Sequence, residues 1–256
     1  TPTLKLSSVV TAEQILEDTN LDYAELTRRK ADGSWEYLAF SPRDVLNKSY
    51  DLPLRALDSI HFVPVKYLPD KIDFDRFSNA IAIMGTANFP GLYSFSESKM
   101  ISQVIEPEQL LSTTDIYYAE IERWKEGERR EYLTFSPIAV FQGRQDFQIL
   151  PRDIIRFLAA GDTGENHDFS KYSDTVLLKG SIRYPGRYAW YEGMQLSDII
   201  QEQDLLIDTE TSYGEIHRHT ETKDTIINFA PDQVVAKKAD VALSPRDNVM
   251  FYPKYY

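Results

Sequence analysis

The stretch GTANFPGLY at residues 85–93 returns as GSIRYPGRY at residues 180–188. Apolar runs precede both copies, at residues 81–84 and 176–178. A Pro-Gly pair between apolar runs is typical of a tight turn, because proline presets φ at one central position and glycine accepts φ > 0 at the next. The stretch therefore predicts strand, turn, strand. Its return after 95 positions predicts a chain of tandem repeats.

Other segments keep the same spacing. A strand reads YAELTR at residues 23–28, YAEIER at 118–123 and YGEIHR at 213–218. A returning strand matches at 36–42, 131–137 and 225–231, and a last strand matches at 51–62, 146–157 and 240–251. The connectors at 73–78 and 168–173 also match, although a mobile loop is expected at 161–166. The first copy has no Pro-Gly turn, so we expect the chain to begin inside a repeat.

These matches predict three domains: residues 1–72, which lack the first hairpin, residues 73–167, and residues 168–256. Each complete repeat is expected to contain strand, turn, strand, helix, strand, hairpin, strand, short helical turn and strand. The helix is expected at 9–18, where apolar residues have helical spacing, and at 100–105 and 194–200. One helix across a small mixed sheet is an α+β arrangement.

The composition is that of a globular chain, and its net charge argues against two classes of anionic partner. The net charge of −12 argues against nucleic acid and against docking on an anionic membrane surface. Cysteine is absent, so disulfides and thiolate chemistry are excluded. No apolar run reaches the ~18–20 residues of a membrane helix, and the start at Thr1 does not resemble a signal peptide. We expect the chain to be a mature or excised fragment.

One face of the strand at residues 23–28 is expected to point into the core. Positions 24, 26 and 28 share a face, because side chains alternate along a strand. These positions carry a small residue, a branched apolar residue and an arginine in every copy. The arginine is therefore expected to lie at the edge of the core with its charged end toward water.

The opposite face carries half-exposed aromatic residues beside carboxylates, and it is the candidate contact surface. Its aromatic members in the first two repeats are Tyr23, Trp35, Tyr37, Tyr118, Trp124 and Tyr132. They could stack on sugar rings. They could also pack against a neighbouring repeat or subunit, as the uncovered side of a small sheet tends to do, and we favour this second interpretation.

Little in the sequence points to catalysis. His217 and His219 share a strand face and could in principle hold a metal, but the other repeats do not keep histidine there, which favours a solvated face. Glu25, Glu120 and Glu215 recur, and one identical carboxylate per repeat indicates a structural hydrogen bond. We find no phosphate loop, nucleophile elbow or zinc motif, and we predict no catalytic residue, metal, cofactor or enzymatic activity.

Trp190 could stack on a sugar, but core filling is the better interpretation. It falls where Phe95 falls in the second repeat, on the face shared with Tyr188. We expect the Pro-Gly turn itself to bind nothing.

The combined pattern resembles the SLBB (soluble ligand-binding β-grasp) domain of Wza-like bacterial polysaccharide export proteins. In the third repeat the matching residues are Gly180, Pro185, Gly186, Tyr188, Leu196, Ile199, Ile200, Leu243, Pro245, Arg246 and Asp247. In the second they are Gly85, Pro90, Gly91, Tyr93, Leu150, Pro151, Arg152 and Asp153. In the first, residues 55–58 depart from the Pro-Arg-Asp signature. The resemblance implies tandem β-grasp-like repeats of about 95 residues over almost the whole chain.

The resemblance also implies a function. Such domains form the periplasmic part of capsule or exopolysaccharide export proteins of the outer membrane, where they stack into rings and contact an inner-membrane copolymerase. The expected role is a passive scaffold that lines or assembles a translocation path, and the expected partners are polysaccharide, other copies and the copolymerase. The alternative is a soluble carbohydrate-binding adaptor that uses the aromatic hairpin face.

Overall fold

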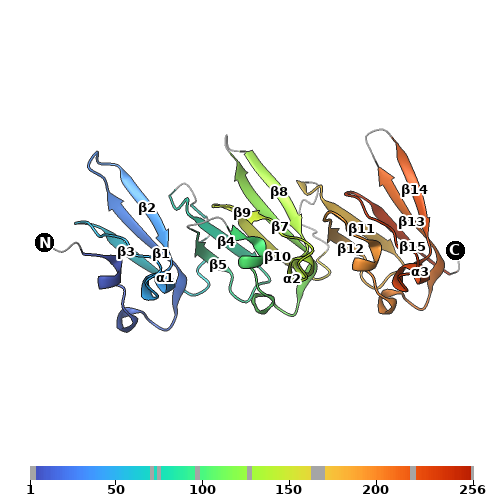
Figure 1. Cartoon of the computed structure of the whole chain (residues 1–256), viewed down its shortest axis with the longest axis horizontal. Coiled ribbons are helices and arrows are strands. Elements are labelled where there is room, and N and C mark those ends of the chain that lie inside the picture. Colours follow the sequence, from blue (N-terminus) through green and yellow to red (C-terminus); the bar gives the residue numbers. More distant parts are fainter. Residues whose placement is uncertain are drawn as a thin grey trace. The chain divides into compact units, whose positions relative to one another are not determined.

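A computed structural model describes residues 4–69, 72–73, 76–95, 99–125, 129–162, 171–219 and 223–254. These residues form a mixed α+β structure made mostly of strands, with few and short helices (Figure 1). The α+β class expected from the sequence is therefore confirmed. Residues 163–166 of the loop expected at 161–166, parts of both connectors and His167 lie outside the described residues. None of the helices in the described ranges has the length and hydropathy of a membrane span.

The described strands form three larger sheets and one small one. The first has the order β2-β1-β3, from β1 (Thr19–Arg29), β2 (Trp35–Phe40) and β3 (Ser59–Pro64). The second has the order β5-β4-β10-β7-β8, from β4 (Ala80–Gly85), β5 (Gly91–Ser94), β7 (Thr114–Lys125), β8 (Arg129–Phe135) and β10 (Ile154–Ala159). The third has the order β12-β11-β15-β13-β14, from β11 (Thr175–Gly180), β12 (Gly186–Ala189), β13 (Thr209–His219), β14 (Asp224–Phe229) and β15 (Asn248–Pro253). A two-stranded sheet pairs β6 (Lys99–Met100) with β9 (Gln148–Ile149).

The Pro-Gly turn joins paired strands at both copies, as the sequence predicts. Its flanking strands pair antiparallel, with Ile83 opposite Gly91 in one copy and Leu178 opposite Gly186 in the other. In the third sheet β11 also pairs parallel with β15, where Leu178 lies opposite Val249. The second and third sheets place corresponding strands in the same order.

The chain divides into two compact units. One comprises residues 1–111, 122–130 and 147–156, and the other comprises residues 112–121, 131–146 and 157–256. The three domain boundaries expected from the sequence remain a prediction.

The longer helices expected from apolar spacing are wrong. Residues 9–18 contain one short 3-10 helix, η2 (Ala12–Gln14), and another, η1 (Leu6–Ser8), lies just before them. The later segments contain the 3-10 helices η3 (Ile101–Gln103) and η6 (Leu196–Asp198). The further turns η4 (Pro107–Gln109) and η7 (Glu202–Asp204) are equally short. In the first segment the adjacent β-branched residues Val9, Val10 and Thr11 have low helix propensity.

The short helical turn expected before the last strand is present in each repeat. The turns are α1 (Pro42–Leu46), α2 (Pro137–Phe141) and α3 (Pro231–Val235). Proline occupies the first helical position, where its fixed φ suits a helix and its missing N–H leaves no donor without a partner. Ser41 caps α1, since its hydroxyl accepts a hydrogen bond from the Asp44 N–H at 3.1 Å.

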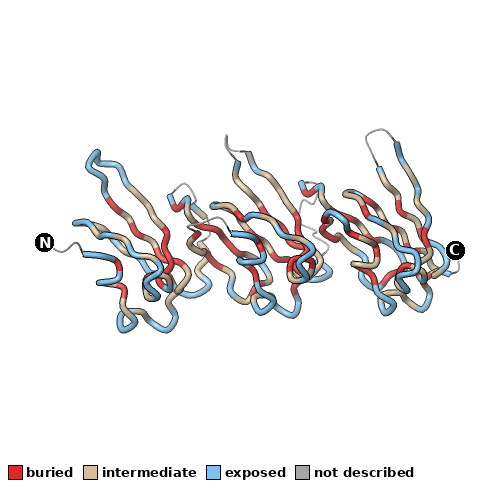
Figure 2. Tube along the Cα trace, viewed as in Figure 1, coloured by how far each residue is buried: buried red, intermediate tan, exposed pale blue. Residues whose placement is uncertain are grey.

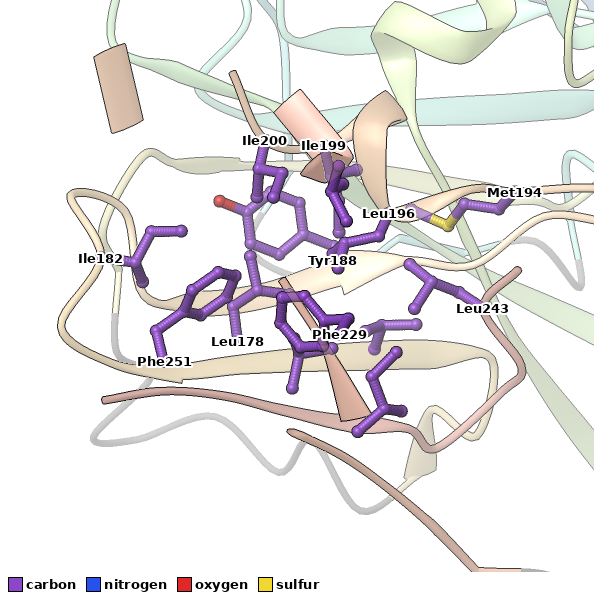
Figure 3. Packing of buried hydrophobic residues seen from close by; sticks show 14 of the residues in the cluster. Leu178, Ile182, Tyr188, Met194, Leu196, Ile199, Ile200, Phe229, Leu243 and Phe251 are labelled. Atoms are coloured by element: carbon purple, nitrogen blue, oxygen red, sulfur yellow. The ribbon is translucent and has the colours of Figure 1, made fainter. Parts of the chain in front are cut away.

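The core of the third sheet lies between the strands and the segment that follows β12. Figure 3 shows Leu178 and Tyr188 from the first hairpin packed with Phe229 and Phe251 from the other strands. Their rings and branched chains exclude water from this face, which is the main favourable contribution to folding. Trp190 is half-buried against this cluster, and its Nε1 donates to the Leu243 carbonyl at 2.8 Å.

A buried arginine–aspartate pair recurs in all three repeats. The pairs are Arg28–Asp58, Arg123–Asp153 and Arg218–Asp247, joined at 2.6, 2.8 and 2.7 Å. Each arginine also donates to a backbone carbonyl, and each aspartate also accepts a backbone N–H three residues earlier. Arg28 is only 3% exposed, so the expectation that its charged end reaches water is wrong. The guanidinium finds its partner inside the fold, and it lowers the pKa of Asp58 below the ordinary value.

Candidate functional site

In the first repeat, two aromatic residues of the candidate contact face lie inside a packed cluster. Tyr23 is 0% exposed and donates a hydrogen bond to Glu25 Oε1 at 3.0 Å. The ring of Tyr37 meets Phe77 edge-on, with 5.7 Å between centroids, and Arg76 lies 4.3 Å from the Tyr37 centroid. The expectation that Tyr23 is half-exposed is therefore wrong, because Phe77 and the β4–β5 strands cover this face. Trp35 is the exception, since it is 52% exposed.

The second repeat repeats this arrangement. Tyr118 is 2% exposed, donates to Glu120 Oε1 at 2.8 Å, and packs with Leu158 and Ala189. The exposure expected for Tyr118 is therefore also wrong, for the same reason: following strands cover it. Tyr132 meets Tyr172 edge-on at 5.4 Å between centroids.

Trp124 packs with the aromatic residues of the first repeat and not with Tyr118. It is half-buried against the cluster that contains Phe77, and Arg130 lies 4.5 Å from its ring centroid. Tyr23, Tyr37 and Trp124 therefore share one cluster, whereas Tyr118 belongs to another, so the six aromatic residues chosen from the sequence do not all meet in one site.

The recurring glutamates accept hydrogen bonds from the tyrosine two residues earlier. The third copy is the most connected: Glu215 accepts from Tyr213 and Tyr252, and His217 Nε2 lies 2.7 Å from its second oxygen. These partners lower the pKa of Glu215 to about 2, since they stabilise the charged form. His219 pairs separately with Asp224 at 2.8 Å. Within the described ranges, no three His, Cys, Asp or Glu side chains gather as a metal site.

A cavity of about 680 Å³, which the sequence did not suggest, lies in the second compact unit. Its walls come from the start of β7, the end of β10 and the second Pro-Gly turn. The aromatic and charged residues that line it are Asp115, Tyr117, Tyr118, Asp162, Arg183, Tyr184, Arg187 and Tyr188. This volume and mixture are typical of a small-molecule site.

Within the cavity wall, tyrosine rings meet one another. Tyr117 and Tyr188 lie 5.4 Å apart between centroids, and the Tyr188 hydroxyl donates to the Tyr184 carbonyl at 2.8 Å. Burial raises the pKa of Asp115 to about 6, although its carboxylate accepts the Tyr117 N–H at 2.8 Å. The cavity therefore combines flat apolar surfaces with groups that can form charged hydrogen bonds.

The corresponding place at the first Pro-Gly turn is closed. There the Leu92 N–H donates to the Tyr67 carbonyl at 3.2 Å, and a Cβ added at Gly91 would lie 3.2 Å from that oxygen. A Cβ added at Gly186 would meet nothing within 4 Å. One sequence difference could have indicated the cavity: Gly161-Asp162 stand at the positions that Lys66-Tyr67 occupy in the first copy.

We expect Asp115→Asn to stabilise the protein at neutral pH and not in acid. Because the folded pKa of about 6 lies above the ordinary 3.8, the contribution of this carboxyl to stability is full below about pH 3.8 and is lost as pH rises through 6. A difference of about 2 in pKa corresponds to at most about 3 kcal/mol. Asparagine keeps the acceptor without the charge, as Asn20 does where its Oδ1 accepts the Asp22 N–H at 2.8 Å.

Urea unfolding of Asp115→Asn at pH 4 and pH 7.5 measures this effect. The matched control is Asn20→Asp, which places a carboxyl at the corresponding position of the first repeat and should destabilise only at the higher pH. An equal change at both pH values would contradict the role assigned to the Asp115 charge.

Compared with known proteins, the chain matches no family model and no curated protein.

Proposed function

We propose that this chain is a non-catalytic, periplasmic part of a bacterial capsule or exopolysaccharide export protein. The observation that carries the proposal is that the hairpin faces of the first two repeats are covered by strands that follow them in the chain. In one unit Tyr23 and Tyr37 pack under strands β4 and β5, and in the other Tyr118 packs against Ala189 of β12. A chain whose successive repeats cover one another suits a scaffold better than a binding surface.

The finer fold that we propose is a tandem array of β-grasp-like repeats. It is supported by the shared strand order of the second and third sheets and by the parallel pairing of β11 with β15. The recurring Arg–Asp pair gives the Pro-Arg-Asp signature a physical role, because the aspartate anchors the turn before the last strand.

The side chains that the sequence offered for catalysis support the non-catalytic role. Glu25, Glu120 and Glu215 each hold a tyrosine hydroxyl of their own strand. The net charge of −12 suits a path that must not retain an anionic polymer. The proposed partners are polysaccharide, other copies of the chain and an inner-membrane copolymerase.

A second candidate function, carbohydrate binding, is favoured by the cavity of the second unit. Sugar rings stack on tyrosine and form hydrogen bonds with carboxylate and guanidinium groups, and the cavity supplies all three. On this alternative the ligand would occupy the cavity and leave the hairpin face packed.

Deletion of the gene in the producing bacterium, followed by complementation, tests whether the protein acts in export and whether it acts as a scaffold or through carbohydrate binding in the cavity. For a scaffold, we expect surface polysaccharide to fall at least tenfold while polymer accumulates inside the envelope, and we expect full restoration by the wild-type gene and by Tyr184→Ala. For cavity binding, Tyr184→Ala would fail to restore export, and the purified variant would lose saturable binding of oligosaccharides from the same polymer. Unchanged surface polysaccharide after deletion would refute export altogether.

A further inference from the structure

Among the described residues, no strand pairs with the outer edge of strand β3. In the third sheet the last strand, β15, lies between β13 and β11, and in the second sheet β10 lies between β7 and β4. In the first sheet β3 pairs with β1 and ends the sheet. Its corresponding strands therefore each have one more neighbour, which comes from a Pro-Gly hairpin.

Side chains of β3 are exposed where their counterparts are buried. Phe62 is 37% exposed, whereas Phe157 and Phe251 are each 1% exposed. Ile60 is half-buried, whereas Val249 is 0% exposed. In the third sheet the cover comes from Val176, Leu178 and Tyr188 of the hairpin, which belong to the same cluster as Val249 and Phe251 (Figure 3).

The backbone beside β3 is open in the same way. In the third sheet the Arg246 N–H donates to the Thr175 carbonyl at 2.7 Å, and the Leu177 N–H donates to the Asp247 carbonyl at 2.9 Å. In the first sheet these positions are Leu57 and Asp58, and no strand of the described residues lies beside them. Leu57 nevertheless keeps the left-handed conformation of Arg246, with φ of 71° against 68°. The acceptor turn is therefore already formed.

Strand β3 also lacks the usual protection of an edge. Proteins commonly block exposed edges with charged residues, proline or bulges. The run from Ser59 to Val63 carries no lysine, arginine or carboxylate, and proline comes only at its end, as Pro64. The burial of β3 in Figure 2 is correspondingly low along most of its length.

We propose that the edge of β3 is a binding site for a β-hairpin of the kind that this chain carries at residues 80–94 and 175–189. Its first strand adds parallel to β3 and pairs with the Leu57–Asp58 turn. Inward apolar residues at the positions of Val176 and Leu178, and a tyrosine at the position of Tyr188, then cover Ile60 and Phe62. This site is independent of the export function proposed above.

A peptide with the sequence of residues 174–190 tests the proposal on the full chain. We expect added peptide to slow amide hydrogen exchange in β3 at least tenfold and to leave exchange in β15 unchanged, because β15 already has its hairpin. The control peptide carries Val176→Lys and Leu178→Lys, which keep the backbone and remove the apolar cover. A second control carries Leu177→Pro, which removes the N–H that bonds the aspartate carbonyl.

In a second format, the 174–190 sequence or its lysine control is fused ahead of Thr1, which avoids the entropic cost of binding a separate peptide. Trp190 is followed by Tyr191, which corresponds to Thr1, so the join has the same length as in the third repeat. The fusion should protect β3 and raise the urea midpoint, and the lysine fusion should do neither. The proposal is overturned if neither format protects β3, if the controls protect equally, or if β3 is protected without peptide in proportion to protein concentration, which would identify a second copy as the occupant.

Discussion

Asp247→Ala is expected to lower the free energy of unfolding by about 3–5 kcal/mol, because it leaves a partly buried guanidinium without its counter-charge. The Asp247 carboxylate is 0% exposed and accepts from Arg218 Nε at 2.9 Å, from Arg218 Nη2 at 2.7 Å and from the Ser244 N–H at 2.8 Å. Alanine removes all three bonds and releases the turn before β15. Urea unfolding followed by tryptophan fluorescence, to which Trp190 of the third sheet contributes, measures the loss.

A matched control separates this pair from surface charges. Asp224 pairs with His219, and the Asp224 side chain is 77% exposed. Asp224→Ala should therefore change the free energy of unfolding by no more than about 0.5 kcal/mol. The double variant Arg218→Met with Asp247→Leu should lose less than Asp247→Ala, since no buried charge remains without a partner. Equal losses for Asp247→Ala and Asp224→Ala would contradict the structural role of the buried pair.

Gly180→Ala is expected to destabilise the third sheet by about 4 kcal/mol, an unusually large loss for one substitution, or to prevent its folding. Gly180 has φ of +91° and pairs with Phe251 across the parallel strands. A Cβ at this position would lie 1.9 Å from the Phe251 carbonyl oxygen, so β11 would have to move away from β15. Strain from φ > 0 adds about 1–2 kcal/mol for a residue with a Cβ.

The control for this close approach is Gly193→Ala. Gly193 has a similar φ of +82°, but an added Cβ would meet nothing within 4 Å. It should therefore show only the conformational cost, about 1–2 kcal/mol. Thermal unfolding of both variants gives the difference. Similar losses would show that the backbone approach at Gly180 contributes little.

The sequence predicted the strands and turns of this protein well. Local chemistry explains this success: Pro-Gly sets the backbone of the first hairpin, and alternation marks the inward face at Ala24 and Leu26. The helix expected at residues 9–18 failed because apolar spacing alone did not outweigh the low helix propensity of Val9, Val10 and Thr11.

The candidate site was less predictable. Tyr23 and Tyr118 alternate outward from their own sheets, and a single strand carries no signal of what covers its outer face. Phe77 and Ala189 do so from elsewhere in the chain. The cavity depends on Gly161 and Asp162 standing where Lys66 and Tyr67 close the first turn, a difference whose effect exists only once the segments are packed.

The sequence by itself determined the repeat, the position of each Pro-Gly turn and the α+β class, because these depend on residues close together in the chain. Only the tertiary structure decided which aromatic rings are buried, where the 680 Å³ cavity opens and which side chains of β3 stay exposed beside an edge that no described strand covers. Those features arise from packing between segments that are distant in the sequence, because the burial of a residue depends on which segment packs against it as well as on the residue itself.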